Sequence, residues 1–189
     1  MDPCNTDHVY PCDPDSQGNL LCSEQAFGGV LVTCEPQSGA GQHITSLRLS
    51  GSIFHGSLTN LDKFNFSMMH TLEVKDTRLS GSLPPVLHGP SLQTVVFDQN
   101  SNLNGPVPTE WAGKFPSLKK LQLSNSSWTG QLPDIWGLSD SFPQLGELAI
   151  SGPSEVQETE ARGLVGPIPA GWGQPGSFPS LEVLEHFLT

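Results

Sequence analysis

The four cysteines are the residues of this chain whose chemistry is easiest to predict. Cys4, Cys12, Cys22 and Cys34 all lie in the first 34 residues, among many Pro, Asp, Asn and Gly. An even, clustered set of this kind indicates disulfide bonds and an oxidising compartment. Three pairings are possible, and the sequence leaves them open; sequential pairing, Cys4–Cys12 and Cys22–Cys34, is the one we expect.

The same segment contains a near match to a calcium-binding loop. Asp13, Asp15 and Glu24 fall at ligand-like spacings after Cys12. Pro11 and Pro14 are incompatible with the helix that should precede such a loop. We therefore interpret the segment as a turn closed by disulfides, and we expect no bound metal.

Other reactive patterns are missing from the sequence. The histidines show no H-x-H or H-x-x-x-H spacing suited to zinc, and neither a G-x-S-x-G motif nor a P-loop occurs. Paired carboxylates for glycoside hydrolysis need fixed positions across a cleft, whereas Glu155, Glu158 and Glu160 share one loop. We predict no catalytic residue, no cofactor and no enzymatic activity. The histidines are His8, His43, His55, His70, His88 and His186.

Charge and hydropathy restrict the partners. The chain has 8 Lys and Arg and 19 Asp and Glu, which gives a formal net charge of −11. This negative charge disfavours nucleic acid as a partner. No apolar run reaches the ~20 residues that span a bilayer. Two N-x-S sequons, at Asn65 and Asn125, are candidate glycosylation sites. Together with the cysteines they predict an extracellular or cell-surface protein whose signal peptide lies outside this chain; a cytoplasmic or cytoskeletal location is the alternative.

An internal repeat organises the rest of the chain. Its clearest copy runs from Leu118 to Pro133, where an L-x-x-L-x-L segment is followed by W-x-G-x-L-P. The equivalent glycines of successive copies are separated by 25, 24, 25 and 36 residues, close to the ~20–29-residue period of leucine-rich repeats. They are Gly56, Gly81, Gly105, Gly130 and Gly166.

Each repeat predicts a strand, a corner and an extended return. The leucine-type residues of the strand should point inward, and the residues between them outward. The corner, where an Asn often satisfies backbone groups, holds Ser52, Thr77, either Asn100 or Ser101, Ser126 and Pro153. In the return, the glycine should permit close approach and the proline should fix an extended backbone. Trp111, Trp136 and Trp172 recur in these returns, and we expect them in the core with each indole N–H bonded to a carbonyl.

The repeat also sets the expected domains. Residues 1–42 do not follow it and should form a cysteine-containing N-terminal cap with little regular structure, apart from a strand before Cys34. Residues 43–189 should form the solenoid, with the C-terminus truncated in a sixth copy. The fifth copy carries about 11 extra residues, because its glycine step is 36 rather than 25. This insertion, residues 154–163, should project as an acidic loop.

The repeat resembles the plant-type leucine-rich repeat, and its P-x-x-W-G…F-P-x-L joining phrase is similar to versions in green-algal proteins. The head of the chain resembles the cap of that family, with Phe27, Gly29 and Cys34 near the cap's Trp, Gly and Cys. The resemblance implies a right-handed solenoid, α/β by class but β-rich in practice. It should have one parallel sheet on its concave face and five full repeats plus a partial sixth. It also implies an extracellular, non-catalytic module that binds protein, peptide or glycan through that face.

The outward strand positions are therefore the candidate binding residues. On the concave face they are Arg48, Glu73, Lys75, Asp98, Lys120, Gln122 and Glu147, and on the loop Glu155, Glu158, Glu160 and Arg162. The face offers one Arg and no aromatic residue, so stacking on sugar rings is disfavoured. The alternatives are a scaffold segment of a longer repeat array and, less favoured, an ice-binding protein. We expect a monomer unless the open C-terminal turn docks on a partner.

Overall fold

In the computed structural model, the described part of the chain forms a β-solenoid of about four turns, built on parallel strands. The described residues are 12–14, 20–22, 29–36, 42–58, 66–153 and 163–187, with the backbone alone described for 12–14, 20–22, 34–36, 42 and 186–187. The predicted solenoid of strand-forming repeats is confirmed at this level.

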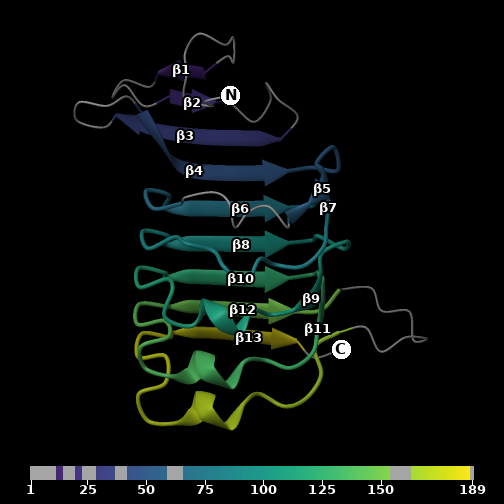
Figure 1. The fold of residues 1–189 in the computed structure, drawn as a ribbon, viewed down its shortest axis with the longest axis vertical. Helices are drawn as coiled ribbons and strands as arrows, with labels where there is room; N and C mark the ends of the chain where they lie inside the picture. The colour runs from purple at the N-terminus through teal and green to yellow at the C-terminus, as the bar shows by residue number, and fades with distance from the viewer. Residues whose placement is uncertain are drawn as a thin grey trace.

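A nine-stranded sheet runs the length of the molecule (Figure 1). Its strands, in spatial order, are β1 (Cys12–Pro14), β2 (Leu20–Cys22), β3 (Val30–Pro36), β4 (Gln42–Ser50), β6 (Thr71–Lys75), β8 (Thr94–Asp98), β10 (Lys120–Ser124), β12 (Glu147–Ser151) and β13 (Val183–Phe187). The first four strands pair antiparallel, whereas β4 and those after it pair in parallel. The change occurs where the repeat begins, because the chain from there returns to the same edge before each new strand.

The register of the parallel strands superposes the leucine-type residues of successive copies. Leu72 pairs with Val95, Val95 with Leu121, and Leu121 with Leu148. All four are buried and belong to one continuous hydrophobic core, as the sequence pattern predicted. Each coil therefore buries its apolar side chains against its two neighbours.

Beside the main sheet, the chain forms a second column of short parallel pairings. β5 (His55–Ser57) pairs with β7 (Arg78–Ser80), and β9 (Asn104–Pro106) with β11 (Ser127–Thr129). The repeat glycines lie in this column, and all five have positive φ, between 81° and 127°. A Cβ at Gly56 would meet nothing within 4 Å, so there the glycine is needed for its backbone conformation rather than for space.

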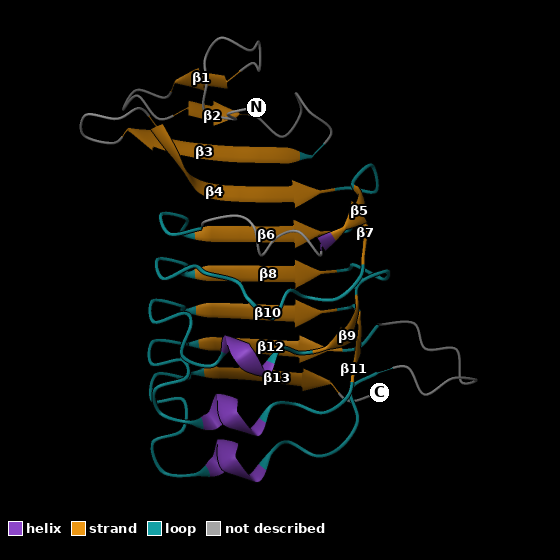
Figure 2. Cartoon of the chain, viewed as in Figure 1, coloured by secondary structure: helices purple, strands orange, loops and turns teal. Residues whose placement is uncertain are grey.

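The returns place aromatic residues at the same height in successive coils. Three short 3-10 helices, η3 (Thr109–Trp111), η4 (Asp134–Gly137) and η5 (Ala170–Gly173), lie one below another across the stack (Figure 2). Each carries one of the three predicted core tryptophans, and all three tryptophans are buried. Trp136 stacks on both Trp111 and Trp172, with ring centroids 6.5 Å apart in each pair.

The tryptophans also tie each coil to the preceding one. The indole N–H of Trp136 donates to the carbonyl oxygen of Pro108 at 3.1 Å. Trp111 and Trp172 make the equivalent bonds to Pro84 and Pro133, both at 2.9 Å. The predicted bond from each indole to a carbonyl is confirmed, and its acceptor is the proline that ends the previous G-x-[LIV]-P phrase.

At the corner after β8, a buried polar side chain forms hydrogen bonds with the neighbouring coils. Asn100 is fully buried, and its Oδ1 accepts from the backbone N–H and the hydroxyl of Thr77 at 3.1 and 2.7 Å. Its Nδ2 donates to the carbonyl oxygen of Val74, and its own N–H donates to the hydroxyl of Ser126. Ser101 is exposed. Of the two candidates for this corner, Asn100 is thus the one that bridges three coils.

The N-terminal segment contains more regular structure than the sequence predicted. The strand before Cys34 is present as β3, and two further short strands, β1 and β2, extend the sheet beyond it. Asp13 lies within β1, while Asp15 and Glu24 of the calcium-like loop are outside the described residues. Backbone pairing of this segment onto β4 supplies the order that its composition did not predict.

The cysteine pairing stays a prediction. Cys4 is outside the described residues, and the backbones of the other three cysteines lie in strands. In the antiparallel register Cys12 is opposite Cys22, and Cys34 is opposite Leu20. Among the described residues, no helix has the length and hydrophobicity required to cross a membrane.

We predict that Trp136→Ala lowers the free energy of unfolding by about 3–5 kcal/mol, because it opens a cavity between two rings and removes the buried hydrogen bond from the indole to the Pro108 carbonyl. Urea denaturation followed by circular dichroism measures the change. Ile135→Ala, at an exposed neighbouring position, is the control and should shift stability by no more than about 0.5 kcal/mol. A loss under about 1.5 kcal/mol for the tryptophan variant would contradict its place in the core.

Asn100→Ala should cost about 1–3 kcal/mol, since it removes the buried hydrogen bonds that the Asn100 side chain makes with the Thr77 hydroxyl and with the Val74 carbonyl. The matched control is Asn104→Ala, in which the side chain removed is exposed. Thermal or urea unfolding of the two variants makes the comparison. Equal stability of the two would show that the corner bonds contribute nothing.

Candidate functional site

The face of the main sheet turned away from the core, here called the open face, is the candidate binding surface. It corresponds to the face predicted as concave, and its residues alternate with the core residues along each strand. In register across the strands, it has three columns. They are Ser46, Thr71, Thr94, Lys120, Glu147 and Val183; Arg48, Glu73, Val96, Gln122, Ala149 and Glu185; and Ser50, Lys75, Asp98, Ser124, Ser151 and, by its backbone register, Phe187. All seven strand residues predicted for binding lie in these columns.

Three of the predicted residues form one ion-pair cluster on β4 and β6. Glu73 lies between two cations: its carboxylate is 3.5 Å from the guanidinium of Arg48 and 3.1 Å from the ammonium of Lys75. The Glu73 side chain is the most covered of the three, at 17% exposure. The cluster therefore has one carboxylate for two cations and keeps one formal positive charge.

A second ion pair lies in the first column. The ammonium of Lys120 donates to the carboxylate of Glu147 at 2.6 Å, between β10 and β12. Both side chains are 36% exposed, so solvent screens the pair and its net contribution to stability is under about 1 kcal/mol. The pair leaves neither the ammonium of Lys120 nor the carboxylate of Glu147 without an opposite charge.

A row of residues in the left-handed backbone region borders the open face where the strands end. Asp76, Gln99 and Asn125 have φ of 50°, 55° and 50°. The Asn125 side chain donates through Nδ2 to the carboxylate of Asp98 at 2.9 Å, and its backbone N–H donates to the Ser151 hydroxyl at 3.1 Å. The candidate glycosylation residue Asn125 is thus half-buried and hydrogen-bonded, while Asn65 is outside the described residues.

The open face is hollowed near its C-terminal end. A hollow of about 210 Å³ is lined by Gln122 and Ser124 of β10, by Asn125, by Ala149–Ser151 of β12 and by Glu185 of β13. Most of its wall is polar. Of these residues only Gln122 was among the predicted binding residues; Glu185 would have been found by extending the outward positions into the sixth strand.

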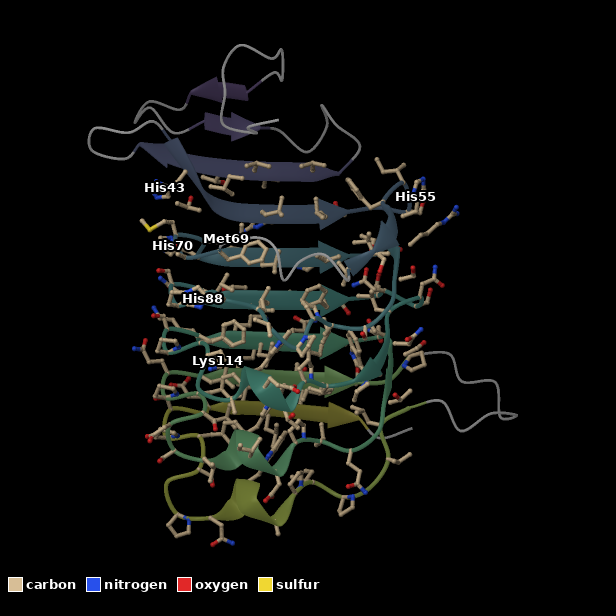
Figure 3. The ribbon with its side chains drawn as sticks, in the orientation of Figure 1. His43, His55, Met69, His70, His88 and Lys114 are labelled. Carbon is tan, nitrogen blue, oxygen red and sulfur yellow. The ribbon has the colours of Figure 1, made fainter. Side chains whose placement is uncertain are left out.

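The histidines whose side chains are described lie at the two edges of the sheet (Figure 3), and the predicted loop residues are outside the described structure. His43, His70 and His88 lie along the edge where the strands begin, and His55 lies at the opposite edge (Figure 3). Within the described residues, no three His, Cys, Asp or Glu side chains gather in a way that could hold a metal ion. The loop residues Glu155, Glu158, Glu160 and Arg162 are outside the described residues.

Comparison with known proteins adds no assignment. No protein-family model matches the sequence, and no curated protein matches it. The function must therefore be argued from the arrangement of residues on the open face. That face offers hydrogen-bonding groups and ion pairs at regular spacing.

Proposed function

We propose that this chain is a non-catalytic recognition module of the plant-type leucine-rich-repeat class. In this proposal the solenoid is right-handed, has five full repeats and a partial sixth, and binds a protein or peptide partner through the open face. The glycan class of ligand is less favoured, because none of the described side chains in the open-face columns is an aromatic one on which a sugar could stack.

The observation that carries the proposal is the regular presentation of polar side chains on a rigid sheet. Residues such as Thr71, Thr94 and Lys120 lie side by side in one column, directly above a buried and continuous core. Side chains on strands are held more precisely than side chains on loops, so the open face is preorganised for contact.

The location that we propose is extracellular or cell-surface. Four cysteines near the N-terminus and two N-x-S sequons support it. The net charge of −11 gives the module a long-range preference for positively charged partners.

Selection from a displayed random-peptide library, with the full chain as target, tests the proposal. We expect enriched peptides whose binding falls at least about tenfold with Thr71→Lys or Thr94→Lys, since a long cation in the middle of the open face obstructs contact there and repels basic partners. Thr109→Lys is the matched control, because Thr109 is exposed in η3, outside the sheet. If no peptide is enriched, or if the three variants bind alike, the proposal is wrong.

A second candidate function is assembly through the last coil. Leu184 occupies the core register position of Leu148, yet it is 42% exposed, as is Val183. Within the described sheet β13 pairs on one side only, with β12, and its other edge has no described strand beside it. In this alternative the occupant of that edge is the same coil of a second copy, which gives a two-fold dimer.

Light scattering over a concentration series tests the alternative. The mass should approach that of a dimer at high concentration and return to that of a monomer in Leu184→Asp. Ile53→Asp, at another exposed apolar residue, should leave it unchanged. A chain that remains monomeric at every concentration contradicts assembly.

A further inference from the structure

A small residue, Ala149, borders the hollow on the open face. In the middle column, Ala149 lies between Gln122 on β10 and Glu185 on β13. The two outer side chains are long and polar, whereas the alanine ends at its Cβ. Val96, at the equivalent place on β8, is 2% exposed and Ala149 is 4% exposed, so both are nearly covered; of the two, only Ala149 borders the hollow.

The wall of the hollow is held in place at the end of β10. The backbone N–H of Asn125 donates to the hydroxyl of Ser151, and the Asn125 amide is oriented by its bond to Asp98. With one Nδ2 hydrogen used in this way, Oδ1 and the second Nδ2 hydrogen of Asn125 are left for a ligand. The bonds link β8, β10 and β12, so binding would not have to order this wall first.

Several oxygens of the wall are available to a ligand. The side chains of Gln122, Ser124 and Glu185 make no hydrogen bond or ion pair with another described residue. Ser124 is 9% exposed, so its hydroxyl is nearly covered by protein while it borders the hollow. A carboxylate, an amide oxygen and hydroxyl oxygens together form a wall that accepts more hydrogen bonds than it donates.

No cation described on the open face is free to neutralise Glu185. Lys120 pairs with Glu147, and Arg48 and Lys75 both pair with Glu73, on the far side of β8. The hollow therefore combines an unneutralised carboxylate with a surplus of acceptors. A guanidinium suits such a wall better than an ammonium, because its planar fork directs five N–H donors at several oxygens at once.

We propose that the hollow over Ala149 binds the guanidinium of an arginine side chain presented by a peptide or protein partner. The inference rests on the proposed recognition function and specifies one contact within it: Glu185 pairs with the charge, and Gln122, Ser124 and Asn125 accept the remaining hydrogens. The apolar Cβ of Ala149 lies under the plane of the guanidinium.

An NMR titration of the 15N-labelled chain tests the pocket directly, with N-acetyl-arginine amide as the probe. We expect saturable shifts at Ala149, Ser151 and the Gln122 side-chain amide. N-acetyl-citrulline amide, a neutral analogue of nearly the same shape, should bind at least about fivefold more weakly, as the loss of a charge-assisted bond predicts. N-acetyl-lysine amide should also bind more weakly than the arginine probe.

Two variants localise the site. Ala149→Leu fills the hollow and should abolish the shifts, whereas Glu185→Gln removes the charge and should weaken binding about 3–10-fold. Glu182→Gln, which makes the same charge change outside the hollow, should bind like the parent chain. Circular dichroism of each variant checks that it folds.

The outcomes separate this inference from the broader proposal. Equal binding of citrulline or of lysine, or arginine shifts that persist in Ala149→Leu, would overturn the guanidinium pocket. If selected peptides bind the open face but are insensitive to Ala149→Leu and Glu185→Gln, the pocket fails and the recognition function stands. If the binding of selected peptides is unchanged by every open-face substitution, both the guanidinium pocket and the proposed recognition function are wrong.

Discussion

The structure depends on the stacking of like residues from one coil to the next. A single coil contains few apolar side chains, and none of them could be buried within that coil alone. Parallel pairing in constant register places Leu72, Val95, Leu121 and Leu148 in one row, and the tryptophans of the returns in another. Each coil therefore buries its apolar side chains against the neighbouring coils. This burial requires the regular spacing of the repeat in the sequence.

That dependence explains which parts of the fold the sequence could predict. Three features recur at a nearly fixed period: the inward residues, the core tryptophans and the glycine column. Because they recur, each repeat supports the same prediction about the position of that residue in the fold. The glycines show the limit of such reasoning. The expected reason for them was close approach, whereas Gly56 has open space around it and requires a positive φ instead.

Features that depend on a single coil were harder to predict. The strands β1 and β2 belong to a segment rich in Pro and Asp, where backbone pairing with β3 outweighs local propensity. The hollow is bordered by Gln122, Ala149 and Glu185 from three adjacent strands, a combination that no periodic pattern predicts. The choice between Asn100 and Ser101 likewise required knowing which of two adjacent residues faces inward.

One set of side-chain hydrogen bonds between coils runs in a single direction along the solenoid, whereas the corner bonds donated by Thr77 and by the backbone N–H of Asn100 run the opposite way. Trp111, Trp136 and Trp172 each donate to a carbonyl of the coil before them, and so do the hydroxyls of Ser127 and Ser180. A coil leaving the ribosome therefore meets acceptors that the earlier coil has already fixed. Folding can proceed from the N-terminal end during synthesis, with each new coil packing on the coil before it.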